Sequence, residues 1–263
     1  MKVLSNKTAV VIGGGGGVGR GVCLGLAGKG MNVVVADIDL NAAMHVTDEI
    51  SRNGNSSVAA QVDATNNESL VQLAEEAVRR FQNVNVLVNT VGVILERRLE
   101  DITEKEWYWI WNLNVIAQLK AVKVFLPTLR KSNDAHIVLT ASGAGFTASS
   151  PELRIGAYST TKHALVGYAK TLRNRESIGV SLLCPSGVVG NLAETSAKSY
   201  NKHIGQQDRD FGGRQPARRK LVDNAVMGAI TAEVIKNNSF IGSNNKEALL
   251  DAIKDEYESL LTQ

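Results

Sequence analysis

Short apolar runs alternate along the chain with longer stretches in which apolar positions recur at the period of a helix. Six apolar runs have the length of strands, at residues 8–13, 32–37, 57–62, 85–90, 135–140 and 179–184. Helical periodicity lies near residues 17–30, 41–53, 67–81, 103–130 and 157–176. Apolar strands separated by amphipathic helices are typical of a parallel sheet covered on both faces, so the pattern predicts an α/β fold.

The apolar pattern weakens towards the carboxyl end. From Ser196 to Lys220 the chain is rich in Lys, Arg, Gln, Gly and Asp, which indicates a long surface loop. We expect residues 192–220 to form a lid over a substrate site. Two further helices are expected at 221–236 and 245–261, with a short strand at 239–241 between them. Since 263 residues can enclose one large core, we expect a single domain over residues 1–263.

A glycine-rich turn joins the first expected strand to the first helix. It reads Gly13-Gly14-Gly15-Gly16-Gly17-Val18-Gly19. Glycine permits positive φ and close backbone approach, and the free N–H groups that begin a helix attract a pyrophosphate. Gly13, Gly17, Val18 and Gly19 are the expected contacts of a dinucleotide in a Rossmann-type, doubly wound sheet. The alternative is a tight turn that binds nothing.

The second expected strand ends in Asp37, where a carboxylate can bond the ribose hydroxyls of a dinucleotide. The same carboxylate would repel a 2′-phosphate. Arg20 is a nearby cation, but no second cation follows Asp37, so the sequence favours NAD over NADP. The alternative for Asp37 is a helix N-cap or a solvated turn.

Tyr158 and Lys162 lie four residues apart on an expected helix and therefore share a face. A free tyrosine has a pKa of about 10, and a neighbouring ammonium lowers that pKa by favouring the phenolate. We expect Lys162 to lower the pKa of Tyr158 in this way. A tuned phenol can exchange protons with an alcohol, which indicates acid–base chemistry.

Composition and charge exclude several other classes of protein. Hydrophobic residues make up 44% and charged residues 21%, as in soluble globular proteins, and the net charge of +3 is too small to indicate nucleic-acid binding. No apolar run is long enough to cross a membrane. The two cysteines, Cys23 and Cys184, suggest no disulfide framework, so we expect a reducing, cytoplasmic location. The four histidines lack ligand spacing, and no metal is expected.

On these motifs the chain resembles the short-chain dehydrogenase/reductase family over roughly residues 5–192. The glycine turn keeps the family's glycines, with Ile12 in place of its threonine. Asp63 resembles the family's aspartate beside the adenine amine. Asn89-Thr90-Val91-Gly92 matches the family's Asn-Asn-Ala-Gly segment, which lines the cofactor site, at Asn89 and Gly92.

The resemblance also implies a catalytic tetrad of Asn114, Ser142, Tyr158 and Lys162, which occur in family order. In the family, tyrosine is the general acid and base, lysine holds the nicotinamide ribose, serine bonds the substrate oxygen, and asparagine positions a water. Tyr158 and Lys162 thus count among the cofactor contacts too. The alternative is that Tyr158 and Lys162 are simply neighbours on a helix surface, an interaction that would contribute only a few tenths of a kcal/mol to stability.

Two departures from the family pattern concern the end of the chain. After the sixth strand the family has Pro-Gly and then a threonine that contacts the nicotinamide. Here Pro185 is followed by Ser186, and Gly190 stands at the threonine position, so we expect contacts from Pro185 and Val188. The ending that builds one tetramer interface in many relatives is missing after Ile241. We expect a homodimer or homotetramer, the dimer through helices near 103–130 and 157–176.

The substrate site is expected to be apolar. Its lining should come from Val93, Ile94, Leu95, Phe146, Leu153, Ile155 and Leu192. This predicts a bulky hydrophobic secondary alcohol or ketone, such as a steroid or an aryl alcohol. Basic residues in the expected lid, namely Arg209, Arg214, Arg218, Arg219 and Lys220, form a solvated face or meet an acidic substrate. The alternatives are therefore a 3-oxoacyl thioester reductase and a non-catalytic NAD sensor on the same fold.

Overall fold

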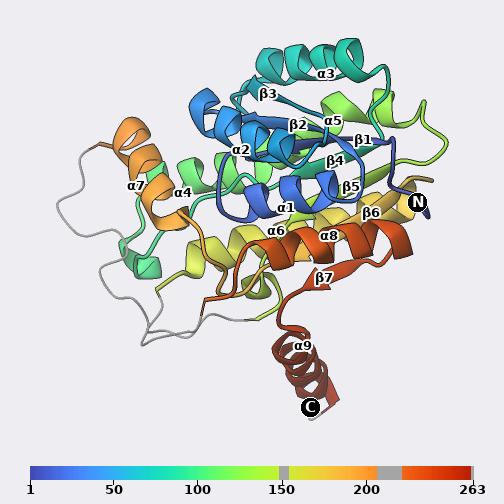
Figure 1. Cartoon of the computed structure of the whole chain (residues 1–263). Coiled ribbons are helices and arrows are strands. Elements are labelled where there is room, and N and C mark those ends of the chain that lie inside the picture. Colours follow the sequence, from blue (N-terminus) through green and yellow to red (C-terminus); the bar gives the residue numbers. More distant parts are fainter. Residues whose placement is uncertain (148–153, 206–220, 262–263) are drawn as a thin grey trace.

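Seven parallel strands form one sheet in the order β3-β2-β1-β4-β5-β6-β7 (Figure 1). The computed structural model describes residues 1–147, 154–205 and 221–261. The strands are β1 (Thr8–Ile12), β2 (Asn32–Asp37), β3 (Ser57–Gln61), β4 (Val86–Asn89), β5 (His136–Thr140), β6 (Gly179–Cys184) and β7 (Ile241–Ser243). The chain passes outwards from β1 to β3 and returns to place β4 beside β1. The sheet is therefore the expected doubly wound, Rossmann-type sheet, and ligands of such sheets bind at the point where the order reverses.

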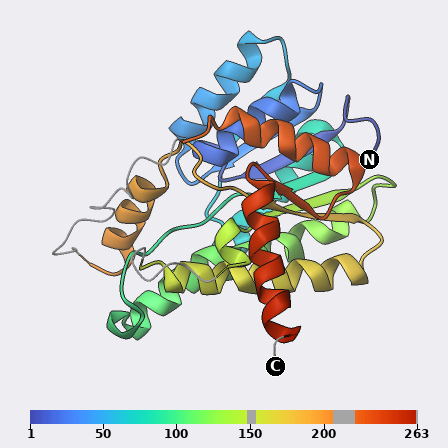
Figure 2. The same ribbon diagram turned by 90° about the horizontal axis from the view of Figure 1, so that it is seen from below.

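Helices cover both faces of the sheet (Figures 1 and 2). Side chains that alternate along the strands form two cores, one with Val11 and Val35 and the other with Ile12 and Ala36. The first core contacts α1 (Gly17–Ala27), α2 (Leu40–Arg52) and α8 (Ala225–Asn237). The second contacts α3 (Asn67–Phe81), α5 (Ala117–Leu129) and α6 (Gly156–Arg175). The expected strands and helices of the first 184 residues are confirmed with small shifts at their ends, except for the helix expected over residues 103–130.

One expected helix is interrupted. The pattern over residues 103–130 predicts a single helix, but the structure has α4 (Glu104–Trp111), a π turn (Asn112–Ile116) and then α5. In the π turn the N–H of Ala117 bonds the carbonyl of Asn112, five residues earlier. Such turns occur mostly as local bulges and often at functional sites. Short 3₁₀ turns at Leu99–Asp101 and Gly143–Gly145 complete this part of the chain.

The expectation of a surface loop from Ser196 is wrong at its start, because α7 (Leu192–His203) continues through this region. The buried positions of α7 are Ser196 and Tyr200, one helical turn apart. Since neither is aliphatic, the buried stripe does not register as apolar periodicity. The rest of the expected lid, residues 206–220 with its five basic residues, lies outside the described residues.

The last elements are α8, β7 and α9 (Lys246–Leu261). The short strand begins at Ile241 instead of the expected 239, because pairing with β6 starts there and continues through Gly242 and Ser243. Helix α9 extends away from the body of the molecule (Figure 1). Among the described residues, no helix is both long and apolar enough to cross a bilayer.

Helices α1 and α8 touch backbone to backbone along a glycine seam formed by Gly21, Gly25 and Gly228. A Cβ built on Gly21 would lie 2.0 Å from the carbonyl oxygen of Asn224, and one on Gly228 would lie 2.2 Å from that of Gly21. A Cβ on Gly25 would lie 2.5 Å from the Cα of Gly228. No side chain fits at these contacts, so the seam fixes α1, and with it the glycine turn that begins α1, against α8.

Candidate active site

The four residues of the expected tetrad come from three elements that meet beyond the carboxyl ends of β4 and β5. Tyr158 and Lys162 lie on the first turns of α6, Ser142 follows β5, and Asn114 lies in the π turn. The side chains of Ser142 and Tyr158 share a hydrogen bond. The ammonium nitrogen of Lys162 lies 5.4 Å from the centre of the Tyr158 ring. The fold therefore brings these three side chains together as expected.

Burial dominates the electrostatics of this group. It raises the pKa of Tyr158, against a smaller lowering by the hydrogen bond from Ser142. It also lowers the pKa of Lys162 to about 8. The expectation that Lys162 lowers the pKa of Tyr158 below its ordinary value is wrong for this structure, because removal from water raises that pKa by more than the Ser142 bond lowers it.

Asn114 ties the tetrad to the neighbouring backbone. Its Oδ1 accepts a hydrogen bond from the Val93 N–H at 2.7 Å, and its Nδ2 donates to the Val93 carbonyl at 2.9 Å. The same Nδ2 donates to Thr161 Oγ1 at 3.0 Å, and that hydroxyl donates to the Tyr158 carbonyl at 2.7 Å. Asn114 thus connects the segment after β4 to the turn of α6 that carries Tyr158. Sequence reasoning missed Thr161, although its place between Tyr158 and Lys162 is a signal.

Lys162 is anchored by main chain. It is 3% exposed, and its Nζ donates to the carbonyl of Thr140 at 2.9 Å. Gly92 leaves room for this group, since a Cβ there would lie 3.3 Å from both Lys162 Nζ and Asn114 Oδ1. Asn89 accepts from the Val91 N–H at 3.0 Å, and its buried Nδ2 has no partner within the described structure. Gly92 therefore lies beside Lys162 and Asn114, and Asn89 holds the backbone just before Gly92.

The glycine turn has the geometry of a dinucleotide cradle. Gly13 and Gly17 have φ angles of +81° and +48°, which favour glycine. A Cβ on Gly19 would lie 2.0 Å from the Gly13 carbonyl oxygen. Thr90 supports the turn by donating to the carbonyls of Ile12 and Gly13, both at 3.0 Å. The residues present fit a pyrophosphate at the start of α1, which places Val18 in its first turn.

Asp37 lies directly against this turn. Its Oδ2 accepts a hydrogen bond from the Gly15 N–H at 2.9 Å. Arg20, the nearby cation, points elsewhere, since its guanidinium pairs with Glu49 of α2 and donates to Asn224 Oδ1 at 3.3 Å. The carboxylate of Asp37 therefore has no competing cation in the described surroundings of the turn.

Comparison with known proteins agrees with this geometry. The family model described as short chain dehydrogenase matches residues 7–201. The chain belongs to the short-chain dehydrogenase/reductase family. It is therefore an oxidoreductase of a family whose members use NAD or NADP.

Individual members of the family are similar over most of their length. The hydroxynaphthalene reductase-like protein Arp2 of Metarhizium robertsii is 30% identical over 201 residues, covering 75% of this chain and 74% of the relative. Fluoren-9-ol dehydrogenase of Terrabacter is 26% identical, covering 76% and 61%. A Burkholderia phymatum short-chain dehydrogenase/reductase, crystallised with NAD, has a TM-score of 0.84 at 28% identity, covering 100% and 97%.

The remaining expected cofactor contacts of this short-chain dehydrogenase lie around the same edge. Asp63 follows β3, and its Oδ1 accepts from the N–H and the hydroxyl of Thr65 at 2.8 and 2.6 Å. Pro185 follows β6, and Val188 forms a bridge with Val222. Ser186, which replaces the family glycine, is held by two hydrogen bonds with the side chain of Asn244.

Helix α7 is fixed over the segment that follows β4. The buried carboxylate of Glu106 on α4 accepts a hydrogen bond from Tyr200 Oη at 2.7 Å and pairs with Arg97 at 2.8 Å. Burial favours a raised pKa for Glu106, but bonds from Thr103 and Tyr200 and the charge of Arg97 hold the pKa below its usual value. Trp109 packs edge-on against Tyr200, with ring centres 5.4 Å apart. The first part of the expected lid, α7, is thus packed against α4.

The expected apolar lining is placed only in part. Val93 and Leu95 are buried with Trp109 and Tyr200 between α4, α6 and α7, so they support the segment rather than face a ligand. Ile94 and Ile155 are half-buried, Phe146 packs against the larger core, and Leu192 is exposed. Leu153 lies outside the described residues.

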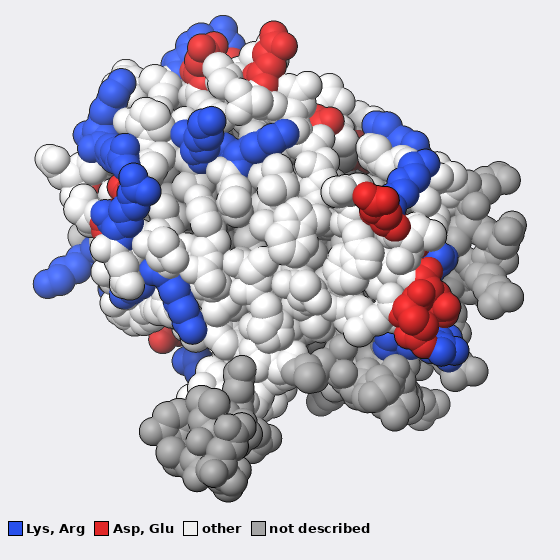
Figure 3. All heavy atoms as spheres, turned by 180° about the vertical axis from the view of Figure 1, so that it is seen from behind, with Lys and Arg blue, Asp and Glu red and all other residues white. Residues whose placement is uncertain are grey.

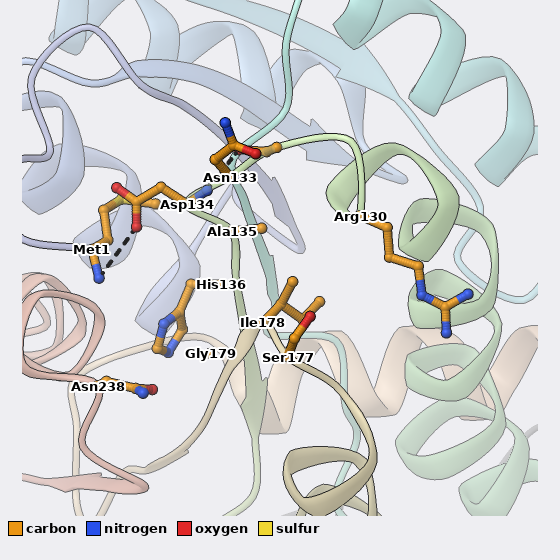
Figure 4. Close-up of a pocket in the computed structure, with 11 residues that line it drawn as sticks. Met1, Arg130, Asn133, Asp134, Ala135, His136, Ser177, Ile178, Gly179 and Asn238 are labelled. Atoms are coloured by element: carbon orange, nitrogen blue, oxygen red, sulfur yellow. Dashed lines mark hydrogen bonds and ion pairs between the residues drawn. The ribbon is translucent and has the colours of Figure 1, made fainter.

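Two surface hollows lie away from the tetrad. One of about 420 Å³ lies at the amino ends of β5 and β6, where Figure 4 shows Met1 paired with Asp134 near His136. The other, of about 460 Å³, is lined by side chains of α4 such as Tyr108 and Trp111. Neither is lined by a residue of the tetrad. The described residues contain no cluster of potential metal ligands.

Proposed function

We propose that this short-chain dehydrogenase interconverts a bulky hydrophobic secondary alcohol, most simply an aryl alcohol, and its ketone with NAD(H). The observation that carries the proposal is the group of half-buried Ser142 and Tyr158 with buried Lys162 at the carboxyl edge of the sheet, beside a glycine turn that fits a dinucleotide. Because the Tyr158 phenol and the Ser142 hydroxyl are within hydrogen-bonding distance of each other, both can bond the same substrate oxygen.

In alcohol oxidation the phenolate of Tyr158 accepts the hydroxyl proton of the substrate and becomes the phenol, and Ser142 donates a hydrogen bond to the same oxygen. In ketone reduction Tyr158 returns the proton, a role that typically contributes about 100- to 10,000-fold to the rate. Bound nicotinamide supplies or takes up the hydride. The charge of Lys162 favours the phenolate that Tyr158 becomes, and its pKa of about 8 lets it exchange protons near neutrality. Asn114 keeps the first turns of α6 in place through Thr161.

The choice of NAD rests on Asp37. Its carboxylate lies at the glycine turn, where the ribose next to the adenine would lie, and Arg20 is paired with Glu49. A 2′-phosphate would meet the negative charge of Asp37 without a compensating cation. Asp63, Asn89, Gly92, Pro185 and Val188 are proposed as further contacts of the cofactor.

The choice of an aryl substrate rests on relatives and on apolar residues near the tetrad. Two relatives are described as a hydroxynaphthalene reductase-like protein and a fluoren-9-ol dehydrogenase, names that refer to fused aromatic rings. Ile94, Phe146 and Ile155 supply apolar surface on the segments around Ser142 and Tyr158. These observations favour a flat hydrophobic substrate over an acyl thioester.

We further propose a homo-oligomer with a contact through α4. Tyr108 and Trp111, one turn apart on α4, are 68% and 37% exposed, and neighbouring exposed apolar side chains of this kind can mark an interaction site. Figure 3 shows charged side chains around the margin of the face opposite to α1 and α8, with a broad uncharged area in its middle. The two buried free cysteines, Cys23 and Cys184, are consistent with a reducing, cytoplasmic location.

The test is turnover of NAD and NADP with a panel of aryl, steroid and 3-hydroxyacyl alcohols. Tyr158→Phe should bind NADH normally and lose turnover by about 100-fold or more, because only the acid–base hydroxyl is removed. Tyr168→Phe, on the same helix but outside the tetrad, is the matched control and should keep full activity. Turnover that survives in Tyr158→Phe refutes the proposed chemistry, and NAD binding without turnover of any alcohol favours the sensor.

A further inference from the structure

Gln118 is a fully buried glutamine on α5, two residues after the π turn and four after Asn114. Its amide makes three hydrogen bonds. Nε2 donates to the carbonyl of Val91 at 3.3 Å and to that of Thr140 at 3.2 Å, and Oε1 accepts from the Thr140 N–H at 3.2 Å. A polar group buried this deeply needs such partners, and those of Gln118 are backbone groups at the ends of two strands, after β4 and at the end of β5.

These bonds lie where β4 and β5 separate. The two strands pair from Val86 and His136 up to Asn89 and Leu139, and their pairing ends there. Thr140 still pairs with Leu183 of β6 but has no partner on the side of β4, and the Val91 carbonyl lies beyond the end of β4. Backbone groups shielded from water cost free energy unless another group bonds them. The side chain of Gln118 supplies the hydrogen bonds that strand pairing no longer provides, so that β4 and β5 can separate next to the tetrad.

The Thr140 carbonyl has a second donor, the Nζ of Lys162 at 2.9 Å. One oxygen therefore accepts from both Gln118 and Lys162, and Gln118 also holds the N–H of the same residue. Thr140 cannot turn or shift without breaking these bonds. The position of the Lys162 ammonium relative to the Tyr158 ring depends on that oxygen.

We propose that Gln118 is a positioning residue of the catalytic group, acting on Lys162 through the Thr140 carbonyl. The inference rests on the proposed function, in which Lys162 serves Tyr158. Gln118 touches neither Tyr158 nor Ser142 in the hydrogen bonds of the structure, so its effect passes through the main chain of β5.

The experiment compares Gln118→Met, which keeps the length of the side chain and removes all three hydrogen bonds, with Gln118→Glu, which keeps the acceptor for the Thr140 N–H. The control is Ser181→Ala, which removes a fully buried hydroxyl that bonds His136 and the Ser239 carbonyl, away from the tetrad. For each variant, kcat per folded molecule, the Kd for NADH and the melting temperature are measured. Acylation of Lys162 is measured by mass spectrometry without cofactor, relative to the exposed Lys123 of α5.

Gln118→Met should lower kcat by about tenfold or more with little change in the Kd for NADH, because small displacements of catalytic groups lower rates strongly. Its Lys162 should react at a clearly different rate relative to Lys123, Gln118→Glu should fall between, and Ser181→Ala should lose only melting temperature. A normal kcat, or a normal Lys162 reactivity, in folded Gln118→Met overturns the inference. If wild-type protein turns over no alcohol, the proposed function fails, and Lys162 reactivity alone decides whether Gln118 positions it.

Discussion

Replacing Lys162 by methionine should make the protein more stable while abolishing its activity. Lys162 is 3% exposed, and burial lowers its pKa from 10.5 to about 8. Each unit of pKa difference corresponds to about 1.4 kcal/mol, so holding the ammonium in the folded state at pH 7 costs about 3 kcal/mol relative to a neutral side chain. Methionine has a similar length and no charge. The variant loses the bond that the charged ammonium donates to Thr140, worth about 2 kcal/mol, so the expected net stabilisation is about 1 kcal/mol.

The stability difference between Lys162→Met and the wild type should depend on pH. Because the folded protein binds the Lys162 proton less tightly than the unfolded chain does, the free energy of unfolding of the wild type rises as pH increases from about 8 to 10.5. Lys162→Met lacks this rise. The advantage of the variant should therefore be largest at pH 7 and close to zero at pH 10.

Urea unfolding of the two proteins at pH 7 and pH 10, without cofactor, measures both values. The exposed lysine variant Lys123→Met is the control and should differ from wild type by the same small amount at both pH values. A Lys162→Met protein that is less stable than wild type at pH 7, or whose advantage is equal at the two pH values, would refute the reasoning. Its turnover should be lost in either case.

Three further outcomes are expected. Asp37→Ala should weaken NAD binding and reduce discrimination against NADP, whereas an unchanged ratio of the two Kd values contradicts the role given to Asp37. Tyr200→Phe keeps the ring against Trp109 but removes a hydrogen bond to the Glu106 carboxylate, so urea unfolding should show a loss of about 1.5–3 kcal/mol. Burial lowers the pKa of His136 from 6.5 to about 3, so folding disfavours its protonation and stability falls as pH decreases below 6.5, by about 2 kcal/mol at pH 5. His136→Gln should remove that part of the acid slope in unfolding curves at pH 7 and 5, and an unchanged slope excludes His136 as its source.

The fold, and the motifs on which the proposed tetrad depends, could be predicted from the sequence because their signals are local. Apolar strands, glycines at a strand-to-helix turn and Tyr158 four residues before Lys162 are read from short segments. The close contact between Gly19 and the Gly13 carbonyl gives the physical reason for one of those glycines.

The features that sequence reasoning missed depend on contacts between distant segments. The buried stripe of α7 consists of Ser196 and Tyr200, which become buried only because Ile94 and Glu106 bond them. The π turn does not change the apolar pattern enough to show in the sequence. The raised pKa of Tyr158 is likewise a result of burial by the whole site, which the spacing to Lys162 does not reveal.

Gln118 could have been noticed, since a glutamine interrupts the otherwise apolar positions at the start of α5. Its partners, however, are main-chain groups of β4 and β5. Side-chain patterns carry no information about where two strands separate.

The glycine seam between α1 and α8 bears on how the protein is made. The glycine turn and α1 leave the ribosome well before α8, which carries Gly228. Because the two backbones touch, a segment with side chains at these contacts cannot take the place of α8 against Gly21 and Gly25. The glycine turn therefore remains open on one side until α8 has been synthesised. A nascent chain that lacks α8 should expose this apolar surface to chaperones and should not be stabilised by cofactor, however much cofactor the cell contains.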